Sequence, residues 1–124
     1  MIAVDTSTLV AYLAGEDGDD TAKMDRALIA QVLFLPPVVL TEILSDPKLP
    51  PAVKSRLQAL PLLSIHPGYW IRAGAVRAKL LGLKLKARVG DALIAQSCLD
   101  HNVPLITRDA VFRHFAKHAK LSIA

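Results

Sequence analysis

Four carboxylates lie beside or inside apolar segments of the chain, where acidic residues are uncommon. They are Asp5, Glu42, Asp91 and Asp109. If the fold gathers them, their mutual repulsion raises their pKa values unless a cation neutralises the charge. Mg²⁺ prefers oxygen ligands of this kind. The pattern therefore predicts a divalent-metal site, provided that the surrounding elements bring the four acids together.

Short apolar segments alternate with helical segments along the chain. The predicted strands are residues 2–5, 34–35, 62–65 and 105–107, with an edge strand at 121–123. The predicted helices are residues 7–14, 20–33, 37–46, 50–60, 67–81, 91–100 and 110–119. The strands are continuously apolar, which is typical of a parallel sheet covered by helices on both faces. The sequence thus indicates an α/β fold.

Such a sheet would place the four acids near one edge. Asp5 ends the first strand, Asp109 follows the strand at 105–107, and Glu42 lies in the second turn of the helix after the second strand. Asp91 opens the helix that leads to the strand at 105–107. Ligands of open parallel sheets bind at the carboxyl ends of the strands, so we expect the acids to be neighbours there.

Each acid also has a simpler explanation when it is considered alone. Asp91 and Asp109 could cap helices, because Asp is a preferred N-cap residue. Neither is followed three residues later by Glu or Gln, so no capping box is expected. Asp5 could end its strand in a turn. Glu42 is harder to explain in this way, because apolar residues flank it on both sides.

The composition predicts one globular domain over residues 1–124, long enough to bury a core without disulfides. Cys98 is the single cysteine, which excludes an intramolecular disulfide and a cysteine-based zinc site. This cysteine usage fits the reducing cytoplasm. No apolar run reaches the roughly 18–20 residues of a membrane span, and the N-terminus lacks the basic start of a signal peptide. A cytoplasmic protein is expected.

The positive charge lies in the second half of the chain. Residues 1–70 carry 5 Lys and Arg against 8 Asp and Glu, whereas residues 71–124 carry 10 against 3. This asymmetry indicates a polyanionic partner bound through phosphate contacts, or else a solvated basic surface. The candidate phosphate-binding residues are Lys84, Lys86, Arg88, Arg108 and Arg113. Arg88 and Arg108 are closest to the acids in sequence and could instead pair with one of them.

The segments around the four acids resemble the motifs of one family. These segments are Val4-Asp5-Thr6-Ser7, residues 37–44, residues 90–95 and residues 105–112. In this order, and over this length, the chain resembles the PIN-domain nucleases, and in size and layout the VapC-type toxins of toxin–antitoxin modules. The resemblance implies a three-layer α/β/α sandwich with a central parallel sheet. It also implies a Mg²⁺- or Mn²⁺-dependent endoribonuclease, a cognate antitoxin and a homodimer.

The resemblance assigns the acidic site to Asp5, Glu42, Asp91 and Asp109, with Ser7 and Thr107 as polar neighbours. Asp5 and Asp91 are the first choice as direct metal ligands. Glu42 and Asp109 would then ligate through water, position the nucleophile or hold a second ion.

Three other functions stay open at the level of sequence. One is a PIN nuclease that processes RNA without an antitoxin. Another is a non-catalytic α/β binding module in which the acids are only caps. A phosphotransfer domain is the third, although a haloacid-dehalogenase-like site would need a second Asp where the chain has Ser7.

Overall fold

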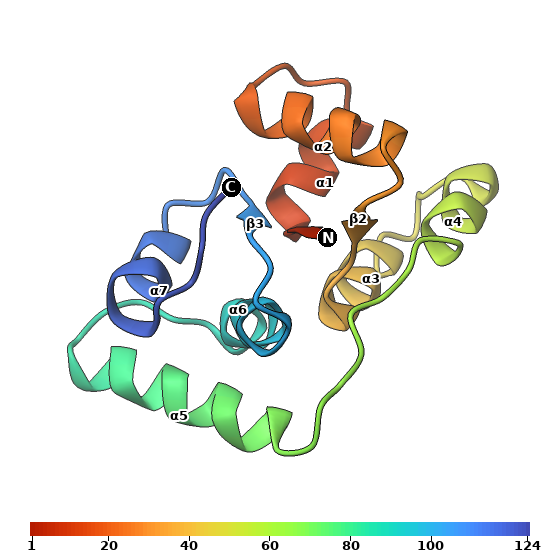
Figure 1. Cartoon of the computed structure of the whole chain (residues 1–124). Coiled ribbons are helices and arrows are strands. Elements are labelled where there is room, and N and C mark those ends of the chain that lie inside the picture. The colour runs from red at the N-terminus through yellow and green to blue at the C-terminus, as the bar shows by residue number, and fades with distance from the viewer.

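The computed structural model describes residues 1–124, which form three short strands and seven helices (Figure 1). The strands are β1 (Ile2–Val4), β2 (Leu33–Phe34) and β3 (Leu105–Ile106). The helices are α1 (Thr6–Leu13), α2 (Asp19–Ile29), α3 (Pro37–Leu44), α4 (Pro51–Gln58), α5 (Tyr69–Gly82), α6 (Val89–His101) and α7 (Phe112–Ala119). None of these helices combines the length and the apolar character needed to cross a membrane.

The strands form one parallel sheet in the order β2-β1-β3, so the first strand of the chain lies in the middle. Ala3 pairs with Phe34 on one side and with Leu105 on the other. Helices α1 and α2 lie on one side of the sheet, and α5 and α6 lie on the other (Figure 1). The predicted α/β/α arrangement around a parallel sheet is confirmed. The carboxyl ends of all three strands therefore meet at one edge.

The sheet is narrower than the sequence predicts. The predicted strand 62–65 makes only one bridge, from Leu62 to Leu35. Leu63 is buried in the core, but Leu62 and Ile65 are each 42% exposed, so a single apolar side chain anchors this segment. At the opposite edge, the predicted strand 121–123 likewise contributes a single bridge to β3.

Two helix boundaries differ from the prediction in ways that affect the site. The helix predicted to continue to Leu33 ends at Ile29, because Gln31 adopts a left-handed conformation with φ of 58° and turns the chain. That turn leaves Leu33 available for β2. Helix α6 begins at Val89, so Asp91 is its third residue and does not open it.

A cluster of 24 buried apolar residues holds the layers together. Val4 and Ile106 of the sheet belong to it, as do the α7 rings Phe112 and Phe115, whose centroids are 5.7 Å apart. Burial of these side chains is the main stabilising contribution. It also fixes the strand ends, so that the polar residues directly after β1 and β3 leave the core at defined places.

Candidate functional site

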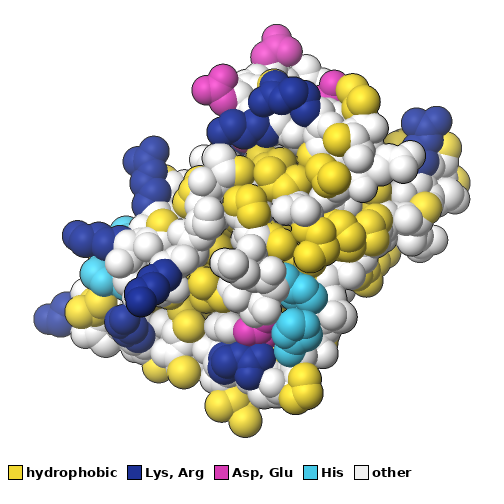
Figure 2. Space-filling view, in the orientation of Figure 1, with side chains coloured by type: hydrophobic (Ala, Val, Ile, Leu, Met, Phe, Trp, Pro, Cys, Tyr) yellow, Lys and Arg dark blue, Asp and Glu magenta, His cyan; other side chains and the backbone are white.

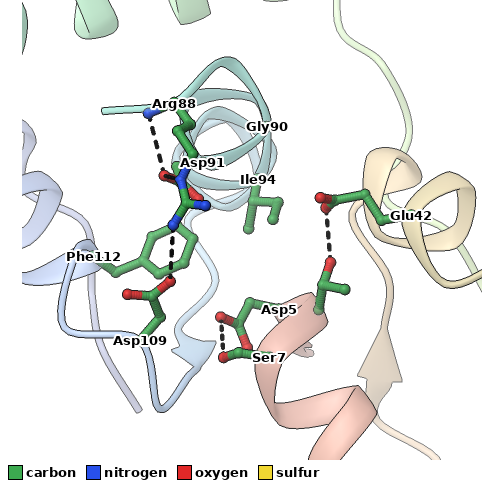
Figure 3. Close-up of a pocket in the computed structure, with 10 residues that line it drawn as sticks. Asp5, Ser7, Glu42, Arg88, Gly90, Asp91, Ile94, Asp109 and Phe112 are labelled. Carbon is green, nitrogen blue, oxygen red and sulfur yellow. Dashed lines mark hydrogen bonds and ion pairs between the residues drawn. The ribbon is translucent and has the colours of Figure 1, made fainter. Parts of the chain in front are cut away.

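A pocket of about 220 Å³ lies where β1 ends and α6 begins, and all four predicted acids line it (Figure 3). Asp5 follows β1 directly, Asp109 comes shortly after β3, Glu42 projects from α3 and Asp91 from the first turn of α6. Thus four elements that are far apart in sequence each contribute one carboxylate. The remaining lining residues are Thr6, Ser7, Arg88, Gly90, Ile94 and Phe112.

Asp5 is the most buried acid of the pocket, with 2% of its surface exposed. Its Oδ2 accepts hydrogen bonds from Ser7 Oγ at 2.7 Å and Thr107 Oγ1 at 2.6 Å. Its Oδ1 accepts one from the Thr8 N–H at 2.9 Å, which makes Asp5 the N-cap of α1 as well. Burial raises the pKa of Asp5, and these hydrogen bonds offset part of the increase. Capping and lining the pocket are therefore compatible at this position.

Thr107 connects the first and the fourth acid. While its hydroxyl donates to Asp5, its Oγ1 accepts a hydrogen bond from the Asp109 N–H at 3.0 Å. Asp109 Oδ1 in turn accepts from the Val111 N–H at 3.0 Å, just before α7 begins. The Thr107 hydroxyl thus fixes the loop between β3 and α7 relative to Asp5. Asp109 Oδ2 remains free of these hydrogen bonds and faces the pocket (Figure 3).

Glu42 lies on the opposite wall of the pocket. Its Oε1 accepts a hydrogen bond from Thr6 Oγ1 at 2.7 Å, which ties α3 to the first turn of α1. The start of α6 comes close to the same carboxylate, because a Cβ added at Gly90 would lie 3.5 Å from Glu42 Oε2. Although apolar residues flank Glu42 in sequence, its side chain is exposed on the pocket side of α3.

Arg88 lies next to two of the acids. Asp91 Oδ2 accepts a hydrogen bond from the Arg88 N–H at 3.2 Å and lies 3.5 Å from Arg88 Nε. The Nη2 atom of the same guanidinium is 3.9 Å from Asp109 Oδ2. The Arg88 side chain is 64% exposed, so both ion pairs are weak and leave the guanidinium accessible from solvent.

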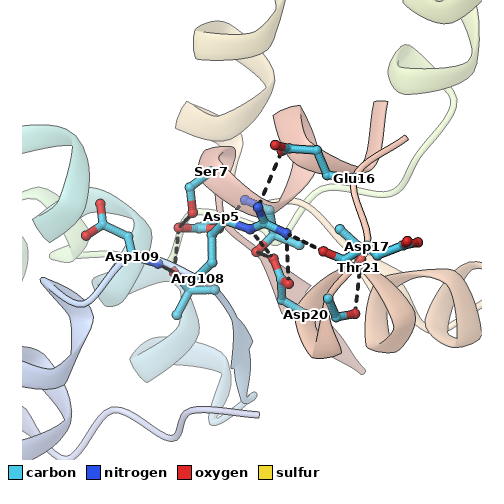
Figure 4. Close-up of polar contacts among 11 residues, drawn as sticks. Asp5, Ser7, Glu16, Asp17, Asp20, Thr21, Arg108 and Asp109 are labelled. Atoms are coloured by element: carbon cyan, nitrogen blue, oxygen red, sulfur yellow. Dashed lines mark hydrogen bonds and ion pairs between the residues drawn. The ribbon is translucent and has the colours of Figure 1, made fainter. Parts of the chain in front are cut away.

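Arg108, the second arginine near the acids, points away from the pocket and pairs with Asp20 (Figure 4). Its Nε and Nη2 donate to the two Asp20 carboxylate oxygens at 2.7 and 3.1 Å. This pairing holds the pKa of Asp20 at about 2. Sequence reasoning missed Asp20, because nothing in the acidic segment 16–20 distinguishes it from its neighbours.

The other basic candidates lie outside the acidic pocket. Lys84, Lys86 and Arg113 are exposed, and Arg113 lines a smaller adjoining cavity together with Thr107 and Asp109. Figure 2 shows several Lys and Arg side chains on the side of the molecule where α7 lies. These side chains form a basic surface on the α7 side (Figure 2), and Arg113 lies in a cavity that shares Asp109 with the acidic pocket.

The chemistry of the pocket suits a hard cation held partly through water. No three Asp, Glu, His or Cys side chains lie close enough together to form a ready-made metal site. Mg²⁺ keeps several of its waters and needs few direct carboxylate ligands. Asp5 is buried and receives hydrogen bonds only from hydroxyl and amide groups, so its negative charge has no cationic side chain as a direct partner. The four carboxylates thus supply the donor type that such an ion requires.

Comparison with known proteins places the chain in a family. The model of the PIN domain family matches residues 2–118. The solved structure of FitAcB from Neisseria gonorrhoeae has a TM-score of 0.69 and 16% identity, over 99% of this chain and 96% of that chain. The structure of VapBC2 from Rickettsia felis, bound to a DNA fragment from their promoter, has a TM-score of 0.67 and 20% identity. That match covers 100% of this chain and 98% of the other chain.

A search among curated proteins found no match. At 16% and 20% identity, the two solved structures show a shared fold. The family match, in contrast, extends over nearly the whole chain and includes all four acids that line the pocket. The chain belongs to the PIN domain family.

Proposed function

We propose that the protein is a divalent-metal-dependent endoribonuclease and the toxin of a type II toxin–antitoxin system. The observation that carries this proposal is the convergence of Asp5, Glu42, Asp91 and Asp109 on one pocket in a PIN domain. A phosphodiester is a polyanion, and four carboxylates repel it unless a cation lies between them. Acids arranged in this way therefore favour hydrolysis that depends on a metal ion.

In this proposal, Asp5 and Asp91 hold the cation directly. Glu42 and Asp109 would hold the cation through water and orient the attacking water. A bound Mg²⁺ or Mn²⁺ lowers the pKa of its water, so that hydroxide is available near neutral pH. Ser7 and Thr107 keep the Asp5 carboxylate oriented through their hydrogen bonds to Oδ2.

The basic residues bind the RNA backbone in this proposal. Arg88 reaches across the pocket between Asp91 and Asp109 and would contact the phosphate at the site of cleavage. Lys84, Lys86 and Arg113 are exposed and would contact phosphates further along the strand. Such contacts give affinity without base specificity.

The proposed assembly is a homodimer with a cognate antitoxin in the cytoplasm. Its support is the motif resemblance to VapC-type toxins and the shared fold with FitAcB and VapBC2. The second of these was solved on promoter DNA. An antitoxin of this protein would have to cover the acidic pocket in order to block the proposed reaction.

The activity is tested with purified protein and a labelled single-stranded RNA. We expect cleavage with Mg²⁺ or Mn²⁺, none with excess EDTA, and a loss of at least about 100-fold for Asp5→Asn and Asp91→Asn, since metal-assisted activation is worth several kcal/mol. Asp100→Asn is the matched control, because this carboxylate lies outside the pocket and pairs with Arg72. Undiminished cleavage by either pocket variant, or in EDTA, would refute the assignment.

The toxin role is tested separately in cells. Induced expression of the wild type should stop growth, and Asp5→Asn should not. Co-expression of the product of an adjacent gene should restore growth and form a stable complex with the protein. Cleavage in vitro without growth arrest would support a PIN nuclease that processes RNA instead.

A further inference from the structure

The Asp20–Arg108 ion pair joins the start of α2 to the loop after β3, and each partner is one residue away from a group that donates to Asp5. Asp20 is the second residue of α2, and Arg108 lies between β3 and α7. The Asp20 side chain is only 11% exposed, and its two oxygens receive the Nε and Nη2 donors of Arg108 in a bidentate arrangement. Glu16 adds a longer contact to the same guanidinium at 3.4 Å.

Two short connections lead from this pair to the carboxylate of Asp5. On one side, Thr8 Oγ1 donates to Asp20 Oδ2 at 2.9 Å, while the Thr8 N–H donates to Asp5 Oδ1. On the other side, Arg108 follows Thr107, whose hydroxyl donates to Asp5 Oδ2. Asp20 therefore holds Thr8, which donates to one oxygen of Asp5, and also Arg108, which directly follows the residue that donates to the other.

The backbone at Gly18 is shaped around this pair. A Cβ added at Gly18 would lie 2.6 Å from Asp20 Oδ1 and 3.2 Å from Arg108 Nη2. The first distance is too short for any side chain, so even alanine would push the carboxylate away from its partners. This close approach is a second observation, independent of the hydrogen bonds, that the position of the pair is tightly defined.

We infer that Asp20 and Arg108 are positioning residues for the acidic pocket, which hold Asp5 and Asp109 in the arrangement that binds a divalent cation. The inference rests on the proposed function. It assigns to Arg108 a role in place of RNA binding, and to Asp20 a role that the motif pattern does not contain. Groups that orient metal ligands from behind typically change metal affinity 10–100-fold when they are replaced.

A second ion pair in the same molecule provides a matched control. Arg72 donates through Nε and Nη2 to the two oxygens of Asp100 at 3.0 and 2.7 Å, in the same bidentate geometry. Asp100 is 7% exposed, close to the 11% of Asp20, but it connects α5 to α6 and has no contact with the pocket. The Asp20–Arg108 and Arg72–Asp100 pairs are therefore alike in geometry and burial, but only the first lies beside residues that contact Asp5.

The experiment measures Mn²⁺ binding to the whole chain by the loss of the free-ion electron paramagnetic resonance signal. The variants are Asp20→Asn, Arg108→Lys and Gly18→Ala, compared with Asp100→Asn and Arg72→Lys at a temperature where melting curves show all of them folded. We expect Mn²⁺ affinity to fall about 10-fold or more for the first three variants and less than about 2-fold for the two controls.

The outcomes separate this inference from the proposed function. If the wild type binds no Mn²⁺, the proposed function fails, and the inference fails with it. If the wild type binds Mn²⁺ and Asp20→Asn binds it as well as Asp100→Asn does, only the inference fails. Lysine at position 108 would keep the positive charge but not the bidentate geometry. If Asp20→Asn lowered the Mn²⁺ affinity and Arg108→Lys did not, charge alone would explain the effect, and the positioning role would be overturned.

Discussion

Asp5 combines two roles that the sequence presents as alternatives. As an N-cap it accepts the Thr8 N–H, and as a pocket residue it presents a buried carboxylate beside Ser7 and Thr107. A motif residue can therefore be structural and chemical at once. Its chemistry has an energetic cost, because burial disfavours the ionised form that a metal ligand must adopt.

The cost of burying the ionised Asp5 carboxylate predicts the thermal stability of Asp5→Asn. In metal-free buffer at pH 7, Asp5→Asn should melt at the same temperature as the wild type or higher. The amide keeps an acceptor for the Thr8 N–H and removes a buried charge whose raised pKa shows that folding disfavours it. Thermal unfolding followed by circular dichroism provides the measurement. Added Mg²⁺ should reverse the order by stabilising only the wild type, and a markedly less stable Asp5→Asn would contradict this account.

Unlike Asp5, the ionised carboxylate of Asp20 should stabilise the fold at neutral pH, and this stabilisation should be lost in acid. The pKa of its carboxyl is lowered from 3.8 to about 2 by Arg108, so its contribution is complete above pH 4 and disappears as pH falls from 4 to 2. The difference in melting temperature between wild type and Asp20→Asn should therefore be largest at neutral pH and vanish near pH 2. A difference that stays constant down to pH 2 would contradict the ion pair.

The elements that carry the site were predictable from the sequence to different degrees. The ends of β1 and β3 follow from apolar runs closed by polar residues, so Asp5 and Asp109 could be placed at one sheet edge in advance. The exact start of α6 could not be predicted, because the N-cap position is Arg88, which is not a standard N-cap residue, and the Asp91 carboxylate accepts the Arg88 N–H.

The pairing of Asp20 with Arg108 could not be predicted from the sequence. Asp20 and Arg108 are 88 residues apart, and no local pattern pairs an acid of one helix with a basic residue after a strand. The strand predicted at 62–65 is reduced to one bridge. A run of apolar residues predicts burial of all of them, whereas only Leu63 is buried and Leu62 and Ile65 are exposed.

Helix α7 supplies both core packing and one wall of the pocket, which leads to a prediction at this scale. Phe112 and Phe115 are both buried, but only Phe112 lines the acidic pocket. Phe112→Leu and Phe115→Leu should each lower the free energy of unfolding by about 1–2 kcal/mol, and only Phe112→Leu should weaken Mn²⁺ binding. Denaturant unfolding and Mn²⁺ titration of the two variants test this prediction. Equal losses of Mn²⁺ affinity in both would show that Phe112 acts only through the core.

At the scale of the whole molecule, opposite charges are separated in space as well as in sequence. The acids converge in the pocket, whereas the excess of Lys and Arg lies in residues 71–124, and several basic side chains form a surface on the side of α7 (Figure 2). Under the proposed function, this surface would attract RNA and the pocket would hold a cation. Arg108 does not contribute to that surface, because Asp20 already neutralises it.

RNA binding by this surface should depend steeply on salt. With Asp5→Asn, which binds without cutting, log K should fall with log salt at a slope of about −2 if about three phosphates are contacted. Arg113→Ala should weaken binding and make the slope shallower, whereas Arg72→Ala should change neither, because Arg72 pairs with Asp100 away from the pocket. Fluorescence anisotropy between 50 and 200 mM salt measures both, and a flat profile would exclude phosphate contacts.

The central place of β1 in the sheet has a consequence for synthesis of the protein. β1 is translated long before one of its two neighbours, β3, because about 100 residues separate the two strands in the sequence. A nascent chain that ends before residue 105 lacks β3 and Asp109, and one that ends before residue 91 lacks Asp91 as well. Translation thus delays the proposed nuclease until residue 109 has been added, and products truncated before that residue should be harmless to the cell that makes them.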